Sequence, residues 1–332
     1  MNVQEFTAKN RDTWSRLSEL LKKRRRSFEE TRELGGLYRT ATEHLSFAQT
    51  EFPDHQTALY LNQLVRECHM LFYRPQKSRF QRFLQFLFKT FPATLARLGI
   101  PILIAAGIFI GSGLVSFFMT VNNIKLAEIF LDPSTYQMAR YDLENKKQFG
   151  NFDDIPEEDR VSVSFFIWYN NSRVSIYCFV LGITLGIGTL YILASNGFML
   201  GALSAFYFLN GSFDDFISLI MIHGSIELPA IIIAGGAGLY IGAAILLPGR
   251  LPRKYRLKEH SRDAFRALAG VVFLLFISGL IEGLITPMKV EIGIRVLIAA
   301  VNTVFILSYF LIGFVWKRKN EDSKNEAILA EA

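Results

Sequence analysis

The stretch His223–Gly242 reads HGSIELPAIIIAGGAGLYIG, and it places two ionisable side chains inside an otherwise apolar run. His223 and Glu227 are four residues apart, so in a helix they share one face. Pro229 follows them, and glycines recur through the second half of the stretch. Because crossing the hydrocarbon of a bilayer takes about 20 apolar residues, the run 226–247 is long enough to do so. The stretch therefore predicts a membrane-spanning helix that carries buried polar groups.

Further apolar runs appear when the same length criterion is applied to the rest of the chain. Hydrophobic residues make up 51% of the 332 residues, slightly more than in a soluble domain, and they concentrate between residues 98 and 316. The expected spans are 98–120, 174–194, 197–210, 226–247, 266–286 and 295–316. The run 197–210 is too short to cross upright unless it continues through Phe216–Ile222 or forms a re-entrant hairpin. The sequence predicts an all-α integral membrane protein of about six transmembrane helices.

Charged residues indicate how such a bundle is oriented. Cytoplasmic loops of membrane proteins carry an excess of Lys and Arg. The sequence is basic at 74–97, 250–266 and 317–319, and net acidic at 121–173. We therefore expect 121–173 outside and both termini in the cytosol, which requires an even number of spans. The first 90 residues lack the features of a cleaved signal peptide, so the first span is expected to act as the insertion signal.

The N-terminal part reads as an ordinary charged sequence with helical periodicity. Trp14, Leu17 and Leu20 recur at helical spacing, as do similar sets further along, and they predict a soluble helical bundle. Residues 76–91 differ, because no acidic residue occurs between Pro75 and Ile100 and the helix is basic and aromatic. Such a helix lies in the membrane interface. The expected domains are 1–92 (cytosolic and helical, with the interfacial helix), 93–318 (polytopic membrane domain) and 319–332 (cytosolic tail).

The expected external segment, 121–173, is the largest piece on its side of the membrane. Its sequence suggests one or two helices and a turn at Gly150–Pro156. Several aromatic side chains indicate that the segment packs against something: Phe130, Tyr136, Tyr141, Phe149 and Phe152.

Three ionisable residues stand out in or beside the expected spans. Glu227 and Glu282 fall inside two spans, and His223 lies just before the span that contains Glu227. Intramembrane ionisable groups are costly and by default suggest a functional site. Three interpretations remain open at this point. The residues can be packing partners, an ion-coupling or transport site, or a hydrolytic or metal site. One His and two Glu match the three-ligand count of catalytic zinc, but the sequence contains no HExxH pattern and its spacing does not show that the three converge.

Helix breaking and close packing are expected around these residues. Pro229 removes a backbone donor and favours a kink. Glycines allow helix backbones to approach closely, and they tolerate unwound backbone beside a cavity. The positions expected to break or pack the helix are Gly224, Pro229, Gly235, Gly236 and Gly238.

Several function classes are disfavoured by what the sequence lacks. No P-loop, dinucleotide fingerprint or Ser-His-Asp arrangement occurs, so an ATPase is not expected and neither is a cofactor. The net charge of +6 follows from membrane topology, and we expect no nucleic-acid partner. Cys68 and Cys178 fall in different expected compartments and do not suggest a disulfide.

Four segments resemble the stage II sporulation protein M family. His223–Gly242 is similar to its central signature, and Asn170–Leu190 (NNSRVSIYCFVLGITLGIGTL) to its second-span motif. The sequences SNGFMLGAL and LIEGLITP (Leu280–Pro287) resemble the following turn and the fifth-span motif. The N-terminal LGGLYRTATEHL and LYLNQLVRECHMLFY resemble the extra cytosolic helices of longer members. By this match the signature positions are His223, Gly224, Glu227, Pro229 and Glu282.

The resemblance implies a protein of the bacterial cytoplasmic membrane. Spore-forming members help to place peptidoglycan-degrading partners, so the first expectation is a scaffold or assembly component of an envelope-remodelling complex, not an enzyme. The alternatives are a transporter or channel with a buried His/Glu site, and an intramembrane hydrolase. The expected partners are the lipid bilayer and other membrane or envelope proteins, with a homodimer also possible.

Overall fold

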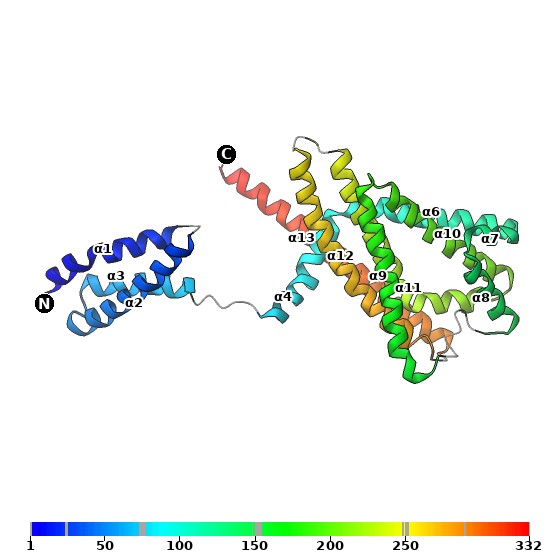
Figure 1. Ribbon diagram of the computed structural model, residues 1–332, viewed down its shortest axis with the longest axis horizontal. Helices are drawn as coiled ribbons and strands as arrows, with labels where there is room; N and C mark the ends of the chain where they lie inside the picture. Colours follow the sequence, from blue (N-terminus) through cyan, green and yellow to red (C-terminus); the bar gives the residue numbers. More distant parts are fainter. Residues whose placement is uncertain are drawn as a thin grey trace. The chain divides into compact units, whose positions relative to one another are not determined.

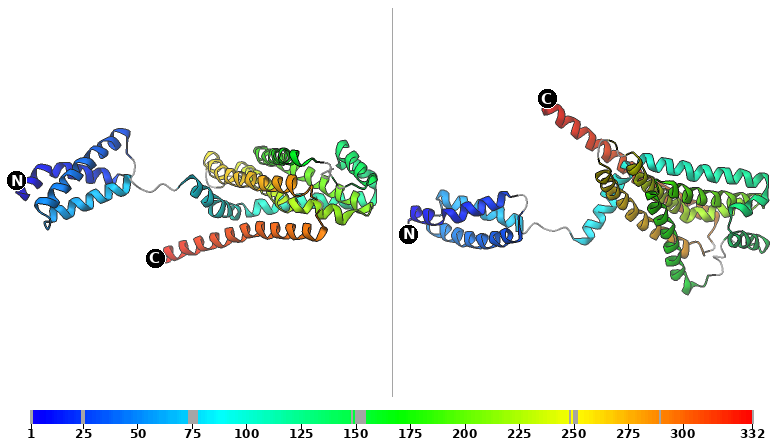
Figure 2. Two further views of the ribbon diagram at one scale, coloured as in Figure 1. Left: turned by 90° about the horizontal axis from the view of Figure 1, so that it is seen from below. Right: turned by 45° about the horizontal axis from the view of Figure 1, so that its top comes forward.

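The computed structural model describes residues 2–23, 26–72, 78–147, 149, 155–247, 249, 252–288 and 290–331, with the backbone alone for 319–331. All regular structure in these ranges is helical (Figures 1 and 2). The chain divides into two compact units, Met1–Arg79 and Phe80–Ala332. Each unit has a hydrophobic core of its own and is described separately.

The first unit is a bundle of three helices, α1 (Val3–Lys22), α2 (Phe28–Glu51) and α3 (Gln56–Phe72). Capping boxes at Asn2 and Ser27 satisfy backbone donors at the starts of α1 and α2, which is worth about 1 kcal/mol at each end. The periodic apolar residues form the core, as the sequence predicts. Its buried members are Phe6, Trp14, Leu17, Leu20, Leu34, Ala41, Leu45, Ala48, Ala58, Leu61, Leu64 and Cys68.

The basic aromatic segment that follows packs on the second unit. It consists of α4 (Arg79–Gln85), a π-helical turn (Phe86–Thr90) and α5 (Phe91–Arg97). The Phe91 ring is 1% exposed and lies directly over Gly270 of α12 (Arg253–Leu284). Arg97 donates to Asp263 of the same helix at 3.0 Å. Phe91 and Arg97 thus pack within the second compact unit, which begins at Phe80, before the expected boundary at residue 92.

Five helices of the described chain are long and apolar enough to span a membrane. They are α6 (Gly99–Asn122), α10 (Ile187–Leu209), α11 (Phe213–Leu246), α12 and α13 (Ile292–Glu331). A further helix, α9 (Arg160–Val180), has 21 residues, and about 32 Å of helix matches the hydrocarbon thickness. It is less apolar, since it carries Asn170, Asn171 and Arg173. The fold is thus an all-α membrane protein.

Two of the expected spans are wrong. The run 174–194 is interrupted because the chain turns through η5 (Leu181–Ile183), and Leu185 and Gly186 both have left-handed backbones, with φ of 59° and 88°. Helix α10 then runs from Ile187 to Leu209 as one full-length element. The segment 197–210 is therefore the second half of α10, not a short or re-entrant span. Residues 174–180 complete α9, which begins inside the segment 121–173 that was expected to be external.

The connection between α6 and α9, residues 123–159, packs on the membrane helices through its aromatic side chains. It contains α7 (Ala127–Phe130) and α8 (Pro133–Glu144). Phe130 stacks on Phe198, and Tyr136 contacts Phe206. Phe149 lies edge-on to Phe216 of α11. These contacts agree with the expected packing, while Tyr141 is half exposed. Phe152 and most of the expected turn at Gly150–Pro156 lie outside the described residues.

Glycines set the closest approaches between the membrane helices. Gly197 and Gly201 of α10 sit against the backbone of α6. On α11, Gly235 faces Leu193, Gly236 faces Ile102, and Gly238 faces Cys178 and Thr189. Gly235, Gly236 and Gly238 thus lie against other helices of the same chain, whereas Gly224 faces only side chains of α11 itself. The expected helix break does not occur, because α11 is continuous for 34 residues with Pro229 inside it.

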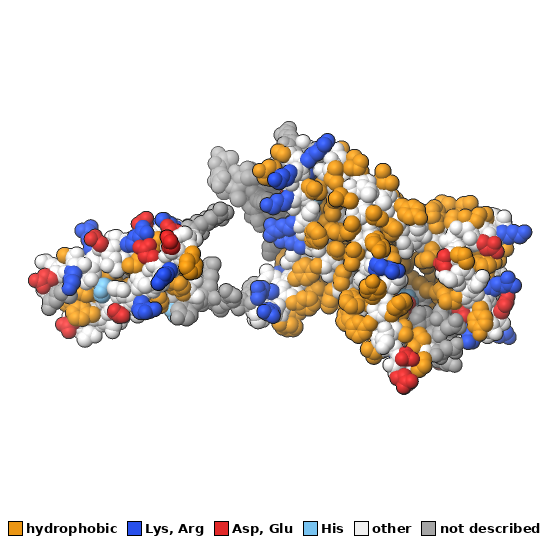
Figure 3. All heavy atoms as spheres, in the orientation of Figure 1, with side chains coloured by type: hydrophobic (Ala, Val, Ile, Leu, Met, Phe, Trp, Pro, Cys, Tyr) orange, Lys and Arg blue, Asp and Glu red, His pale blue; other side chains and the backbone are white. Residues whose placement is uncertain are grey.

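The outer surface of this unit is largely apolar (Figure 3). Large hydrophobic side chains such as Leu103, Phe166 and Val304 are two-thirds or more exposed, as expected where helices face lipid. Lys and Arg side chains gather where α4 and α12 begin (Figure 3). The exposed basic residues there are Arg79, Arg82, Arg253, Lys254 and Lys258.

Candidate functional site

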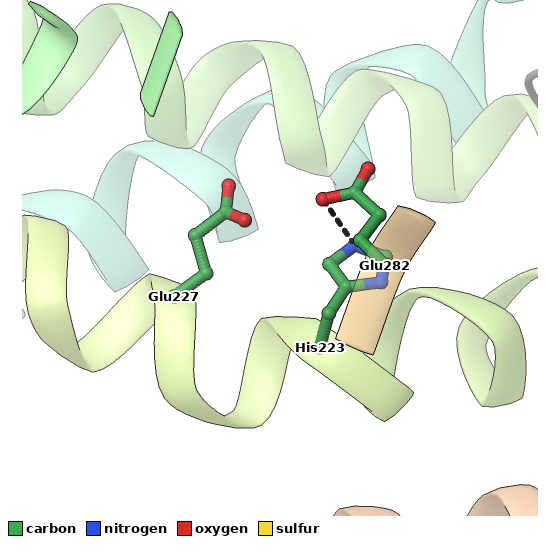
Figure 4. A group of neighbouring side chains, drawn as sticks. All are labelled: His223, Glu227 and Glu282. Carbon is green, nitrogen blue, oxygen red and sulfur yellow. Dashed lines mark ion pairs between the residues drawn. The ribbon is translucent and has the colours of Figure 1, made fainter. Parts of the chain in front are cut away.

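The three ionisable residues singled out in the spans converge on one point. Helix α11 carries His223 and Glu227 one turn apart, and α12 passes alongside and contributes Glu282 (Figure 4). His223 Nε2 lies 3.8 Å from Glu282 Oε2. One ligand-type atom from each of the three residues lies within 4.8 Å of the others. Glu282, 59 positions after His223 in the sequence, thus lies in the same cluster as the two residues of α11.

These polar groups are buried with few protein partners. His223 is 6% exposed, and the side chain of Glu282 is 14% exposed. The Ser278 hydroxyl lies 3.4 Å from Glu227 Oε2 and 3.2 Å from the carbonyl oxygen of His223. Within the described residues, His223 Nδ1 and Glu282 Oε2 have no hydrogen-bond partner. A buried polar atom without a partner costs about 1–3 kcal/mol, so these two atoms call for an explanation.

A cavity of about 350 Å³ adjoins the cluster. Its wall is built from α6, α8, α9, α10, α11 and α12, and it extends from the cluster to Thr135 and Met138 of the 123–159 connection. Three amide side chains, Asn170, Asn171 and Asn196, add polarity to a mostly apolar lining. The described lining contains no Lys or Arg.

This composition determines what the site can bind. Two carboxylates and one imidazole carry a net charge of −1 when all are ionised. Isolated charges are strongly disfavoured away from water unless they are paired, protonated or bound to a metal. Among the described residues of the lining, no side chain other than the histidine itself can carry a positive charge. The arrangement is therefore suited to taking up protons or a cation.

The glycines of α11 fall into two groups, one at the cavity and one at the contacts with neighbouring helices. Gly224 lines the cavity beside His223. Gly235, Gly236 and Gly238 lie further along α11 and face neighbouring helices instead. Asn302 of α13 donates to the carbonyl oxygen of Ile222 at 2.8 Å, which holds the α11 backbone next to the site.

Sequence reasoning missed Ser278 and the residues of α8. Ser278 is four positions before Glu282 on α12, so it lies on the same face, and this spacing was a usable signal. The α8 residues were not detectable in this way, because only tertiary packing brings residues 133–144 over the cavity.

The fold and the site together define a polytopic helical membrane protein with a polar site inside its bundle. The sequence profile of the family Stage II sporulation protein M matches residues 98–287, more than half of the chain. The chain belongs to this family. The matched region runs from α6 to the end of α12 and includes His223, Glu227 and Glu282.

Two further comparisons add detail. Residues 4–74 match a separate profile, Domain of unknown function (DUF8413), which coincides with the three-helix unit. A relative from Methanocaldococcus jannaschii, Uncharacterized protein MJ0706, is 28% identical over 188 residues, covering 56% of this chain and 80% of the relative. No solved structure matches the chain.

Proposed function

We propose that the membrane unit is a transporter that binds a cation at His223, Glu227 and Glu282 during passage through the bundle. The observation that carries this proposal is the convergence of the three groups on one cavity without a Lys or Arg in its described lining. Intramembrane ionisable groups that face a cavity typically mark ion pathways. A site between helices, deep within the bundle, is also typical of transporters.

Flux through reconstituted protein tests this proposal. The full chain is placed in liposomes, and uptake of protons, Na⁺, K⁺, Mn²⁺ and Zn²⁺ is followed with ion-sensitive dyes. Wild-type protein is expected to conduct at least one of these ions, and Glu227→Gln is expected to fall to the rate of protein-free liposomes. Glu259→Gln is the matched control, because Glu259 is an exposed carboxylate on α12. Wild-type liposomes that conduct none of these ions would contradict the proposal.

A scaffold role in an envelope-remodelling complex is the second candidate, and a feature of the first unit favours it. Helix α3 exposes apolar side chains, including Leu59 at 65% and Met70 at 55%. Exposed apolar patches in soluble units often mark interaction sites. If this surface docks a partner, the double variant Leu59→Glu, Met70→Glu should no longer crosslink in cells to the proteins that crosslink to the wild-type chain. Asn62→Glu, an exposed change on the same helix, should leave them in place.

The proposed setting is the bacterial cytoplasmic membrane with both termini in the cytosol. The basic residues where α4 and α12 begin support this orientation. The homodimer remains a separate proposal. The glycines of α10 and α11 named above are covered by helices of the same chain and so do not by themselves require a second copy. Light scattering of the protein in detergent measures the oligomeric state.

A further inference from the structure

We propose that His223, Glu227 and Glu282 bind one divalent first-row transition-metal ion, with Zn²⁺ as its representative. This inference names the cation class for the site of the proposed function. It does not require that the ion be transported, since a metal held permanently would use the same three side chains.

The first argument is geometric. Zinc bonds to imidazole nitrogen and carboxylate oxygen are about 2.0–2.2 Å long, so tetrahedral ligand atoms lie about 3.3–3.6 Å apart. In the structure the three ligand atoms lie within 4.8 Å of one another, and the His223–Glu282 pair is at 3.8 Å. Each atom needs to move by about 1 Å, which glutamate side-chain torsions supply without a change in the helices.

The second argument is the state of the unbound atoms. Glu282 Oε2 is buried and lacks a hydrogen-bond partner in the described structure. If the two carboxylates stay ionised, no positive side chain in the described lining other than His223 offsets them. A divalent ion bound to His223 Nε2 and to both carboxylates neutralises them and gives Glu282 Oε2 a partner. Ser278, at 3.4 Å from Glu227 Oε2, is placed to orient that carboxylate as outer-shell groups do.

The third argument concerns which metal the donors select. Ca²⁺ and Mg²⁺ prefer all-oxygen sets, and Ca²⁺ takes six to eight ligands. Imidazole suits Zn²⁺, Fe²⁺, Ni²⁺ and Cu²⁺ better than those two ions, whereas Cu⁺ is selected by cysteine and methionine sulfur. None of the three proposed ligands offers sulfur. No cysteine lines the described part of the cavity. Three protein ligands leave at least one position on the ion open, and the cavity of about 350 Å³ has room for water or a small ligand there.

Metal binding to the purified full-length protein in detergent tests the inference without relying on any activity. After chelation and removal of the chelator, calorimetry with ZnCl₂ and elemental analysis should give one Zn²⁺ per chain. Mn²⁺ should bind more weakly, following the usual order of affinities, and Ca²⁺ should not compete. Glu282→Gln and His223→Ala should weaken Zn²⁺ binding by at least about 100-fold, because even outer-shell changes cost 10- to 100-fold.

Two control variants separate this site from adventitious binding. Glu259→Gln and His55→Ala alter an exposed carboxylate and an exposed histidine, and both should bind Zn²⁺ as the wild type does. In wild-type protein, Co²⁺ should produce a visible absorption spectrum of a low-coordinate site that Zn²⁺ abolishes, a measurement that does not depend on a variant folding correctly.

Three results would overturn the metal site: no stoichiometric Zn²⁺ in the wild type, binding unchanged in Glu282→Gln, or no Zn²⁺-sensitive Co²⁺ spectrum. The transport proposal fails separately. If the protein binds stoichiometric Zn²⁺ but conducts no ion, the transport proposal is wrong and the metal site stands. If it conducts protons, Na⁺ or K⁺ but binds no metal, the metal site is wrong and the transport proposal stands.

Discussion

At the scale of single residues, the candidate site depends on a contact between two helices, α11 and α12. The spacing of His223 and Glu227 puts them on one face of a helix, and this is observed. The ion pair, however, joins His223 to Glu282, because α12 runs beside α11 in a register that no local pattern specifies. Periodicity finds neighbours one turn apart. It cannot find neighbours on another helix.

His44 offers a residue-scale test in the first unit. Trp14 Nε1 donates to His44 Nδ1 at 3.0 Å, which requires that nitrogen to be unprotonated. Burial lowers the pKa of His44 below its ordinary value of 6.5. Because the folded pKa is the lower one, the stabilising contribution is complete above about pH 6.5 and is lost as the pH falls below it.

The melting temperature of residues 1–79 is expected to fall when the pH is lowered from 7 to 5. Trp14 fluorescence measures this unfolding. His44→Gln keeps a hydrogen-bond acceptor and does not titrate, so it should remove most of this drop. An equal drop in the variant would show that another group controls the pH response.

At the scale of elements, the misplaced spans have a clear physical cause. Residues 181–186 read LGITLG, so the turn between α9 and α10 is as apolar as the helices it joins. The hydropathy therefore shows no minimum between the two helices that would mark the turn. The turn after α9 instead depends on backbone conformation, because Leu185 and Gly186 adopt left-handed φ angles that a helix cannot contain. By contrast, the expected spans 98–120 and 295–316 agree to within three residues with α6 and with the apolar part of α13, Ile292–Arg318. Helix α12 begins at Arg253, 13 residues before the expected start at residue 266, because its first turns are basic and carry no apolar signal.

The packing of α11 on its neighbours gives a prediction for this scale. A Cβ at Gly238 would lie 2.5 Å from the carbonyl oxygen of Cys178 and 2.6 Å from Thr189 Oγ1. Gly238→Ala should therefore destabilise the membrane unit by about 1–3 kcal/mol, the usual cost of overpacking. Gly107→Ala is the matched control, since nothing lies within 4 Å of a Cβ there, and it should be neutral or stabilising by up to about 1 kcal/mol. Melting temperatures in detergent measure both, and equal effects would mean that the α11 contacts are looser than described.

At the scale of the whole molecule, charge and hydropathy sufficed to predict an all-α membrane protein with a separate N-terminal bundle. They did not place the 80–97 segment against α12 and α13, because a basic aromatic helix has the same sequence pattern whether it packs on protein or on lipid. They also left the role of α9 unresolved. Its 21 residues can cross the bilayer, yet Arg173 and its two neighbouring asparagines make it the least apolar candidate.

Reporter fusions decide whether α9 crosses. If it does, there are six spans, and a reporter active only outside the cytosol should work after residues 147 and 212 and fail after residues 184, 255 and 322. Residue 184 lies in the turn between α9 and α10, so it is the informative position. If α9 stays outside, the reporter works after 184 and fails after 212, and every later connection is inverted. That inversion would put Arg253, Lys254 and Lys258 outside the cytosol, against the usual distribution of basic residues, which is why we expect the six-span result.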